Sequence, residues 1–286
     1  MKTFAIAFIL SGMVLLRASA QVTVEVSMDQ DEFLPGEAVP LAVEITNLSG
    51  QQLHLGADPG WLTFSVESVD GFNVRRESEV PVPGQFDLFS SQAGITHVDI
   101  EPSFDISRIG RYKVTAYLRI KDWSVTVNSQ PATFDVITGA KLWSQDFGVP
   151  STNGVPEMRE FTLEKANYLR EQLRLYVQLT DASESRVFKV FALGPMVSFG
   201  YPEEQIDRTS QLHVLWQTGG QSYSYCILSP DGVVLHRDIY DIFGSRPKLN
   251  VDDNGDVSVV GGVKRVPASE IPQVQMPDAL PPALSK

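Results

Sequence analysis

The sequence predicts an all-β protein in which a two-sheet sandwich is followed by a repeat of short antiparallel sheets. Three observations lead to this fold class. Short segments of alternating apolar and polar residues recur through the first half, turn-forming Gly, Pro, Asn and Asp residues separate them, and the second half repeats at a spacing of about 45 residues. Alternation with a period of two is typical of a half-buried β-strand.

A secretory signal peptide is predicted over residues 1–20. Lys2 gives a charged start, an apolar run covers residues 4–16, and the small residues 18–20 form an A-x-A cleavage signal. The run is shorter than the roughly 20 apolar residues that span a bilayer. Gln21 takes the place of the cysteine that a bacterial lipoprotein signal would acylate, so a soluble product is expected. The mature protein is therefore expected to be secreted or periplasmic, without membrane insertion.

Residues 21–138 are predicted to form the sandwich. Residues 22–26, 41–45 and 62–66 each alternate between apolar and mixed positions, and turn-forming sequences such as 57–60 lie between them. Strands that recur about every dozen residues are typical of a sandwich of two antiparallel sheets.

Two segments carry a resemblance to a known family. Residues 33–50 resemble the opening of bacterial extracellular immunoglobulin-like domains, and residues 104–116 resemble their penultimate corner and strand. In the second segment Tyr112 follows closely after Gly110, which is the arrangement of a tyrosine corner, where the hydroxyl turns back to the backbone. The resemblance implies an immunoglobulin-like sandwich and indicates nothing about function, because such folds serve many roles.

Residues 139–156 are interpreted as a linker, because glycines and prolines interrupt both patterns there. The linker also contains Leu142, Trp143 and Phe147, which are too apolar for a free segment. We therefore expect it to be held against one or both domains.

Residues 157–266 are predicted to repeat a unit of short strands. Four pairs of similar residues are spaced by 45 in the sequence: Pro202 and Pro247, Asp207 and Asp252, Leu212 and Val257, Val214 and Val259. The best-defined unit has strands at 211–216, 222–228 and 233–239, with a turn at 229–232. It resembles the blades of β-propeller proteins, including sialidase-like enzymes. About two and a half units fit, fewer than the four blades of the smallest closed propellers, so an incomplete repeat is expected.

An incomplete repeat predicts unshielded apolar residues on its end sheets. We expect partial exposure of six side chains, Leu175, Val177, Leu212, Val214, Val257 and Val259. Docking of the sandwich onto them is preferred to self-association, so a monomer is favoured over a homodimer. Residues 164–172 fit either a helix or a strand, and the proline-rich tail 267–286 is expected to be disordered or extended.

The composition excludes several classes of function. The net charge of −12 argues against nucleic acid as a partner, because an acidic surface repels phosphate backbones. Cys226 is the single cysteine, so no intramolecular disulfide forms, and a buried, unreactive thiol is expected. Hydrolase, phosphate-loop and zinc-protease motifs are absent from the sequence.

Candidate sites are few, and no catalytic residue, metal site or cofactor is predicted. His213 and His236 fall in neighbouring strands of one repeat unit, where a sheet can bring them together, and residues 250–256 fit a β-turn better than a calcium loop. The candidate binding residues are aromatic, because aromatic side chains at strand ends often contact sugars or proteins. They are Trp61, Trp123, Tyr223 and Tyr225.

The sequence thus predicts an exported, non-catalytic protein that binds a ligand or takes part in an envelope or extracellular assembly, and it resembles uncharacterised exported bacterial proteins. A protein or a glycan is the expected partner. Two alternatives remain: a carbohydrate-active hydrolase built on the repeat half, and a purely structural accessory module. A concave pocket with converging Asp, Glu, Tyr or Arg side chains favours the hydrolase, whereas an open sheet edge favours the structural module.

Overall fold

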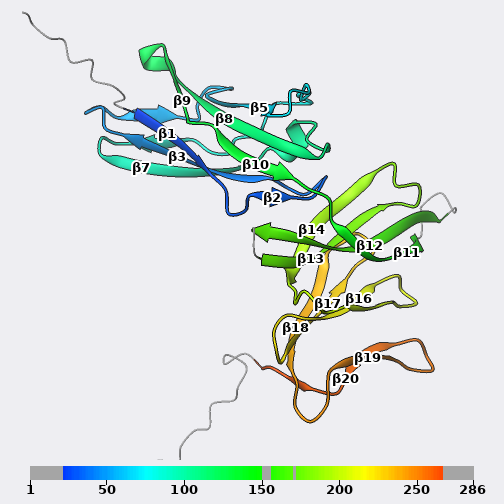
Figure 1. Cartoon of the computed structure of the whole chain (residues 1–286). Helices are drawn as coiled ribbons and strands as arrows, with labels where there is room; N and C mark the ends of the chain where they lie inside the picture. Colours follow the sequence, from blue (N-terminus) through cyan, green and yellow to red (C-terminus); the bar gives the residue numbers. More distant parts are fainter. Residues whose placement is uncertain (1–21, 150–155, 170–171, 267–286) are drawn as a thin grey trace, which may run out of the picture. The chain divides into compact units, whose positions relative to one another are not determined.

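The computed structural model describes residues 22–149, 156–169 and 172–266, and these are almost entirely strands and turns (Figure 1). The all-β prediction is confirmed: the described residues form several separate antiparallel sheets, each with an open strand order. The chain divides into two compact units. The first comprises Met1–Phe33 and Ala38–Val136, and the second comprises Leu34–Glu37 and Ile137–Lys286.

The first unit is a sandwich of two main sheets. One has the order β1–β3–β7, and the other has the order β2–β10–β8–β5 with β9 paired to β8. A small β4–β6 pair lies beside them. The strands are β1 (Val22–Ser27), β2 (Glu32–Phe33), β3 (Pro40–Asn47), β4 (Leu53–Leu55), β5 (Leu62–Ser68), β6 (Phe86–Leu88), β7 (Gln92–Asp99), β8 (Gly110–Ile120), β9 (Val125–Asn128) and β10 (Ala132–Val136), with short 3-10 turns at Glu101–Ser103 and Lys121–Trp123.

The alternation in the sequence builds the core of this unit. In β3, Leu41, Val43 and Ile45 are fully buried, and they share one hydrophobic core with Val114 and Leu118 of β8 in the other sheet. Burial of both inner faces against each other makes the two sheets a single sandwich.

The tyrosine corner is present as predicted. The hydroxyl of the buried Tyr112 donates a hydrogen bond to the carbonyl of Arg108, four residues earlier. Its ring stacks on Phe134 of the neighbouring strand, with ring centroids 5.4 Å apart. The corner therefore ties the loop before β8 to the core.

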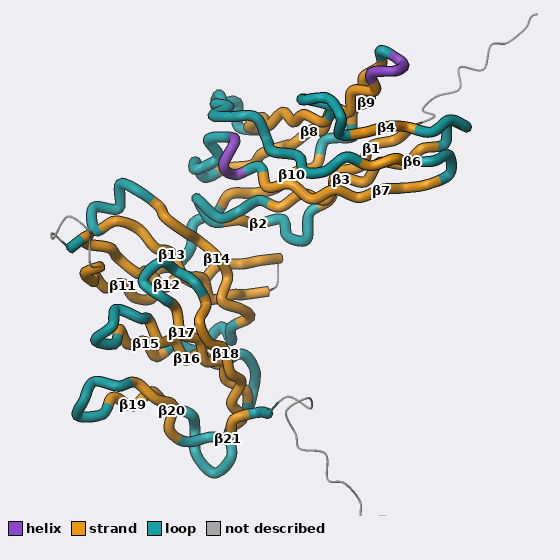
Figure 2. The backbone as a smooth tube through the Cα atoms, turned by 180° about the vertical axis from the view of Figure 1, so that it is seen from behind, coloured by secondary structure: helices purple, strands orange, loops and turns teal. Residues whose placement is uncertain are grey.

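The second unit consists of a four-stranded sheet, a five-stranded sheet and a two-stranded hairpin, with orders β11–β12–β13–β14, β15–β16–β17–β18–β21 and β19–β20 (Figure 2). Its strands are β11 (Ala140–Val149), β12 (Glu157–Leu169), β13 (Gln172–Asp181), β14 (Val187–Pro195), β15 (Glu203–Ile206), β16 (Leu212–Gln217), β17 (Ser222–Leu228), β18 (Val234–Asp241), β19 (Lys248–Val251), β20 (Val257–Val260) and β21 (Val263–Lys264).

A single kind of turn recurs in the second unit at the predicted spacing. Between β15 and β16, Oδ1 of Asp207 accepts the backbone N–H groups two and four residues later, at 2.8 and 2.9 Å. Between β19 and β20, Asp252 does the same at 2.9 and 2.8 Å. Between β17 and β18 the acceptor is Oγ of Ser229. Residues 250–256 thus form the predicted β-turn, and the hairpin β19–β20 repeats the hairpin β15–β16.

The two larger sheets of this unit pack face to face, which overturns most of the predicted exposure. Leu175 and Val177 of β13 share one core with Leu212 and Val214 of β16, and all four have exposed fractions of 0 or 1%. Each sheet therefore shields the apolar face of the other. Only Val257 and Val259, in the terminal hairpin, are partly exposed as expected.

The predicted linker is largely a strand. Residues 140–149 form β11, which pairs with β12 along its whole length, and Phe147 stacks on Phe161 with ring centroids 4.5 Å apart. Leu142 and Trp143 pack against the same core of the second unit. These residues are apolar because this segment is the edge strand of a sheet whose face lies in the core.

The structure settles one open question of the sequence analysis and corrects one boundary. Residues 164–169 belong to β12 and residues 172–181 to β13, so the ambiguous stretch is a β-hairpin where the structure describes it. Leu34–Glu37, predicted as part of the sandwich, belongs to the second unit, where Leu34 is buried against Tyr176 and Val190. Phe33 is buried in the first unit, and the next side chain along an extended chain points the opposite way.

The predicted signal peptide 1–20 and the tail 267–286 lie outside the described residues. Within the described ranges, no helix has the length and apolar character that a membrane-spanning helix needs.

Candidate functional site

The first unit has a cavity of about 630 Å³ at one end of β5 and β8. Its wall is built from the loop 56–63, from the segment that carries Arg76, Glu79 and Val80, and from Arg119 at the end of β8. The backbone N–H of Arg119 donates to the carbonyl of Trp61 (2.7 Å), so the loop and the strand end are held together. The wall is apolar where Val80 and Trp61 are buried, and it is charged at the rim.

Arg119 lies where this cavity meets a second, smaller one of about 470 Å³, because it lines both. Its Nη2 donates to the carbonyl of Pro59 (2.9 Å). In the described part of the chain no carboxylate pairs with Arg119, whereas Lys121 nearby is paired with Asp58 (2.7 Å) and Arg76 with Glu79. Arg119 is thus an exposed, uncompensated cation at the junction of two cavities, which suits it to an anionic group on a ligand.

Two of the four aromatic candidates lie in the first unit and two in the second, and three of the four are buried. Trp61 lines the larger cavity, but only 6% of it is exposed, and its ring packs edge to face on Phe86. Trp123 is half-buried in the turn before β9 and packs against the sandwich core. Tyr223 and Tyr225 are buried in β17. Of these four residues, Trp61 is the one that lines either of the two cavities described above.

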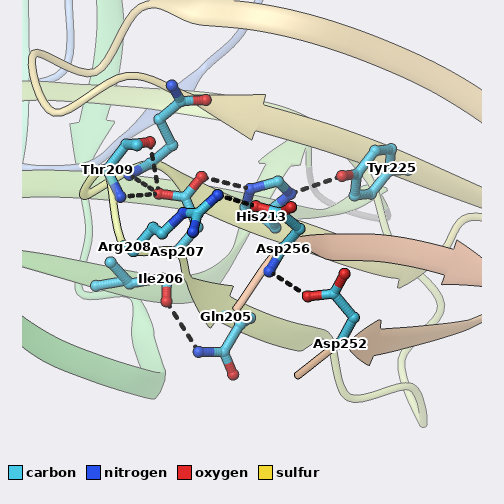
Figure 3. Close-up of polar contacts among 10 residues, drawn as sticks. Gln205, Ile206, Asp207, Arg208, Thr209, His213, Tyr225, Asp252 and Asp256 are labelled. Atoms are coloured by element: carbon cyan, nitrogen blue, oxygen red, sulfur yellow. Dashed lines mark hydrogen bonds and ion pairs between the residues drawn. The ribbon is translucent and has the colours of Figure 1, made fainter. Parts of the chain in front are cut away.

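The second unit contains a chain of polar contacts that sequence reasoning did not find (Figure 3). Nδ1 of His213 lies 2.6 Å from the hydroxyl of Tyr225, and Nε2 of His213 lies 3.3 Å from Oδ2 of Asp207. Asp207 comes from the turn before β16, His213 from β16 and Tyr225 from β17. Arg208 extends the set by pairing with Asp256 (2.9 Å) of the next turn in the repeat.

The chemistry of this chain favours a structural role. Burial, followed by the nearby charges, raises the pKa of Tyr225 to about 12, so its hydroxyl stays protonated near neutral pH. Burial alone would raise the pKa of Asp207, but the N–H of Gln211 and the other hydrogen bonds that its carboxylate accepts outweigh burial and lower it. A protonated, buried tyrosine beside a histidine and an ionised aspartate forms a satisfied polar network.

Asp207 both caps its turn and contacts His213, and we predict that Asp207→Ser separates these two roles. Ser229 shows that a serine can cap this turn, so the variant keeps the turn and loses the contact with His213. We expect a loss of about 1–2 kcal/mol in unfolding free energy at pH 7. Because the folded-state pKa of Asp207 is lowered, its stabilisation is present above about pH 4, the usual carboxyl pKa, and is lost as the pH falls through the folded-state value.

Urea unfolding at pH 7 and at pH 3 checks this prediction, with Asp252→Ser as the matched control. Asp252 caps the equivalent turn and contacts no histidine. Asp252→Ser should therefore lose less than half as much unfolding free energy at pH 7 as Asp207→Ser. The difference in unfolding free energy between the two variants should be smaller at pH 3. Equal losses at pH 7 would show that the contact with His213 contributes nothing.

The remaining candidates do not assemble into a site. His213 and His236 lie on β16 and β18, which flank β17, and both are opposite Ile227. The ring of Tyr225 lies between theirs, at centroid distances of 6.0 and 6.3 Å. In the described ranges no group of three or more His, Cys, Asp or Glu residues is arranged to hold a metal ion. Cys226 is fully buried as expected, and burial raises its pKa.

Comparison with known proteins places this chain in no family. No family model matches the sequence, and no curated protein is similar to it. The crystal structure of Spo0M, a sporulation control protein from Bacillus subtilis, is similar over 60% of this chain and 90% of that chain, with 12% sequence identity and a TM-score of 0.29. That likeness is too weak to support an argument about fold or function.

Proposed function

We propose that this protein is an exported, non-catalytic binding protein whose ligand enters the cavity beside Trp61 and presents an anionic group to Arg119. The observation that carries the proposal is the convergence of two cavities on an unpaired guanidinium. Export is proposed from the signal sequence at residues 1–20. The ligand is a glycan or an extended protein segment, because a shallow wall of loop backbone and apolar side chains suits either class.

The contents of the cavity support binding rather than catalysis. Around it, Arg76 and Glu79 neutralise each other, and so do Lys121 and Asp58. A hydrolase needs an acid and a base or nucleophile that act together on one bond. In the second unit Tyr225, which a sialidase-like enzyme would use as a nucleophile, is buried and protonated. The hydrolase alternative therefore gains no support from either place.

A binding measurement with an Arg119→Gln variant tests the proposal. A glycan array that carries neutral and uronate-containing oligosaccharides should show selective retention of acidic members, because a guanidinium holds a carboxylate with two charge-assisted hydrogen bonds. Arg119→Gln should weaken that binding about tenfold or more.

Arg75→Gln is the matched control. Arg75 is an exposed arginine of the same unit that is paired with Glu77 and lies outside both cavities. The Arg75→Gln variant should bind acidic oligosaccharides as tightly as the unaltered protein does. Equal weakening by both substitutions, or binding that is indifferent to the ligand charge, would contradict the assignment of Arg119.

A further inference from the structure

The terminal hairpin of the second unit is an unfinished copy of a complete sheet. The hairpin β19–β20 repeats β15–β16, down to the aspartate that caps the turn. β16 is paired on both edges, with β15 on one side and β17 on the other. In the part of the chain that the structure describes, β20 pairs with β19 alone. The outer edge of β20 therefore stands where its counterpart has a neighbouring strand.

The side chains of β20 are also less buried than those of β16. Leu212 and Val214 of β16 are fully buried, whereas their counterparts Val257 and Val259 are only half-buried, and Val260 is 46% exposed. A central strand in this repeat is thus covered, whereas β20 has the sequence of a central strand with only part of that cover, because Val259 packs against the cluster of Leu215, Tyr223 and Tyr225.

The sequence of β20 also lacks the usual protection of an edge strand. Exposed edges are normally blunted by charged residues, prolines or bulges that prevent pairing with another chain. β15 carries Glu203 and Glu204, and β18 carries His236 and Arg237. β20 reads Val-Ser-Val-Val, a short segment of high β-propensity with neither charge nor proline. This edge is suited to pairing.

The charges around β20 indicate which strand it accepts. Asp252 and Asp253 precede β20 and are exposed at the turn. Lys264 and Arg265 follow β20, but they are paired with Asp238 and Asp241 of β18. The available cation is Lys248, the exposed partner of Val260 in the hairpin, at the end of β20 away from the turn. The hairpin is therefore acidic at its turn and carries the cation Lys248 at its other end, so an antiparallel copy places the acidic turn of each molecule beside the basic end of the other.

We propose that β20 pairs antiparallel with β20 of a second copy of this chain about a two-fold axis near Ser258. The product is a four-stranded sheet with the order β19–β20–β20–β19, which has as many strands as the sheet β11–β14. A two-fold axis closes the assembly at two copies, because each molecule uses the same edge. The sequence-based preference for a monomer assumed that docking of the sandwich shields six apolar side chains. Four of them, Leu175, Val177, Leu212 and Val214, are buried inside the second unit, and the two that stay partly exposed, Val257 and Val259, lie on β20.

Sedimentation velocity over a range of protein concentrations at moderate salt tests the proposal. The unaltered protein should pass from monomer to dimer as its concentration rises. Ser258→Lys should raise the dissociation constant about tenfold or more, because the two lysines meet near the axis. Ser258 is exposed, so the variant should keep the circular dichroism spectrum and melting temperature of the unaltered protein.

Two controls separate pairing from damage to the hairpin. Asn250→Lys adds the same charge to the same hairpin on β19, opposite Ser258, and should leave the dimer intact. Ser258→Glu should be monomeric alone and should form a mixed dimer with Ser258→Lys, since opposite charges then meet at the axis.

Hydrogen exchange locates the contact. The amides of Val257–Val260 on the outer edge should gain protection only when the dimer forms. Protection at concentrations where the protein is monomeric would mean that another part of the chain already covers this edge, and it would overturn the proposal. A dimer that survives Ser258→Lys unchanged would overturn it as well.

Discussion

Replacing Trp216 with Ala is expected to destabilise the second unit by about 4 kcal/mol, within the range for removal of a large aromatic side chain from a core. Trp216 is 1% exposed in β16 and belongs to the core between the two larger sheets. Its indole N–H donates to the carbonyl of Pro195 (2.9 Å), and its ring packs close to Gly194. The substitution therefore removes apolar contacts from both sheets and the hydrogen bond to Pro195.

Native-state hydrogen exchange of amides in β13 and β16 measures this loss directly, because those strands belong to the second unit. Trp143→Ala is the matched control. Trp143 is half-buried at the edge strand β11 and packs against the same core, so about 1–2 kcal/mol is expected, in proportion to the smaller area buried. A larger loss for Trp143 than for Trp216 would mean that the core is centred on β11 rather than between the two sheets.

Local sequence patterns predicted the elements whose determinants are local. Alternation identified β3 and β5, because each strand has one face in the core. The spacing of Asp207 and Asp252 identified the recurring turn, because the capping carboxylate bonds to N–H groups within four residues. Gly110 and Tyr112 at the start of β8 identified the tyrosine corner, whose hydrogen bond also spans four residues.

The errors arose where distant pairing decides the structure. β11 was read as part of a linker because glycines and prolines interrupt the periodic patterns between residues 139 and 156, although β12 pairs with it along its whole length. Leu34–Glu37 was assigned to the sandwich because only its packing against Tyr176 reveals that it belongs elsewhere. The exposure of Leu175 was overestimated because the two larger sheets cover each other's faces.

The candidate sites were the hardest part to predict. Arg119 lines its cavity together with Arg76 and Pro59, which are far from it in the sequence. His213 meets Tyr225 because the pairing of β16 with β17 places Tyr225 diagonally across from it, two residues from its direct partner Ile227. The spacing of six residues between Asp207 and His213 was visible in the sequence, but it became a contact only once the turn was known.

The loop that forms the cavity wall contains one glycine, Gly56, whose substitution should strongly destabilise the first unit. Gly56 has a φ of +87°, and a Cβ placed on it would lie 2.2 Å from the carbonyl oxygen of Gly84 and 2.9 Å from Cα of Gln85. Both obstacles are backbone atoms, so no side-chain rotation relieves the clash. We expect Gly56→Ala to lower the stability of the first unit by about 3–5 kcal/mol through the sum of backbone strain and steric overlap.

Gly50→Ala separates the two causes, because Gly50 has a similar φ of +79° and no atom within 4 Å of the added Cβ. Strain alone should cost about 1 kcal/mol there. Hydrogen exchange of amides in β5 and β8 gives both values. Gly56→Ala should also weaken ligand binding in molecules that remain folded, because relief of the clash moves the loop that carries Trp61 away from Arg119. Equal losses of stability for the two variants would mean that this loop yields to the added methyl group, and the cavity would then be adjustable rather than fixed by the backbone contact at Gly84.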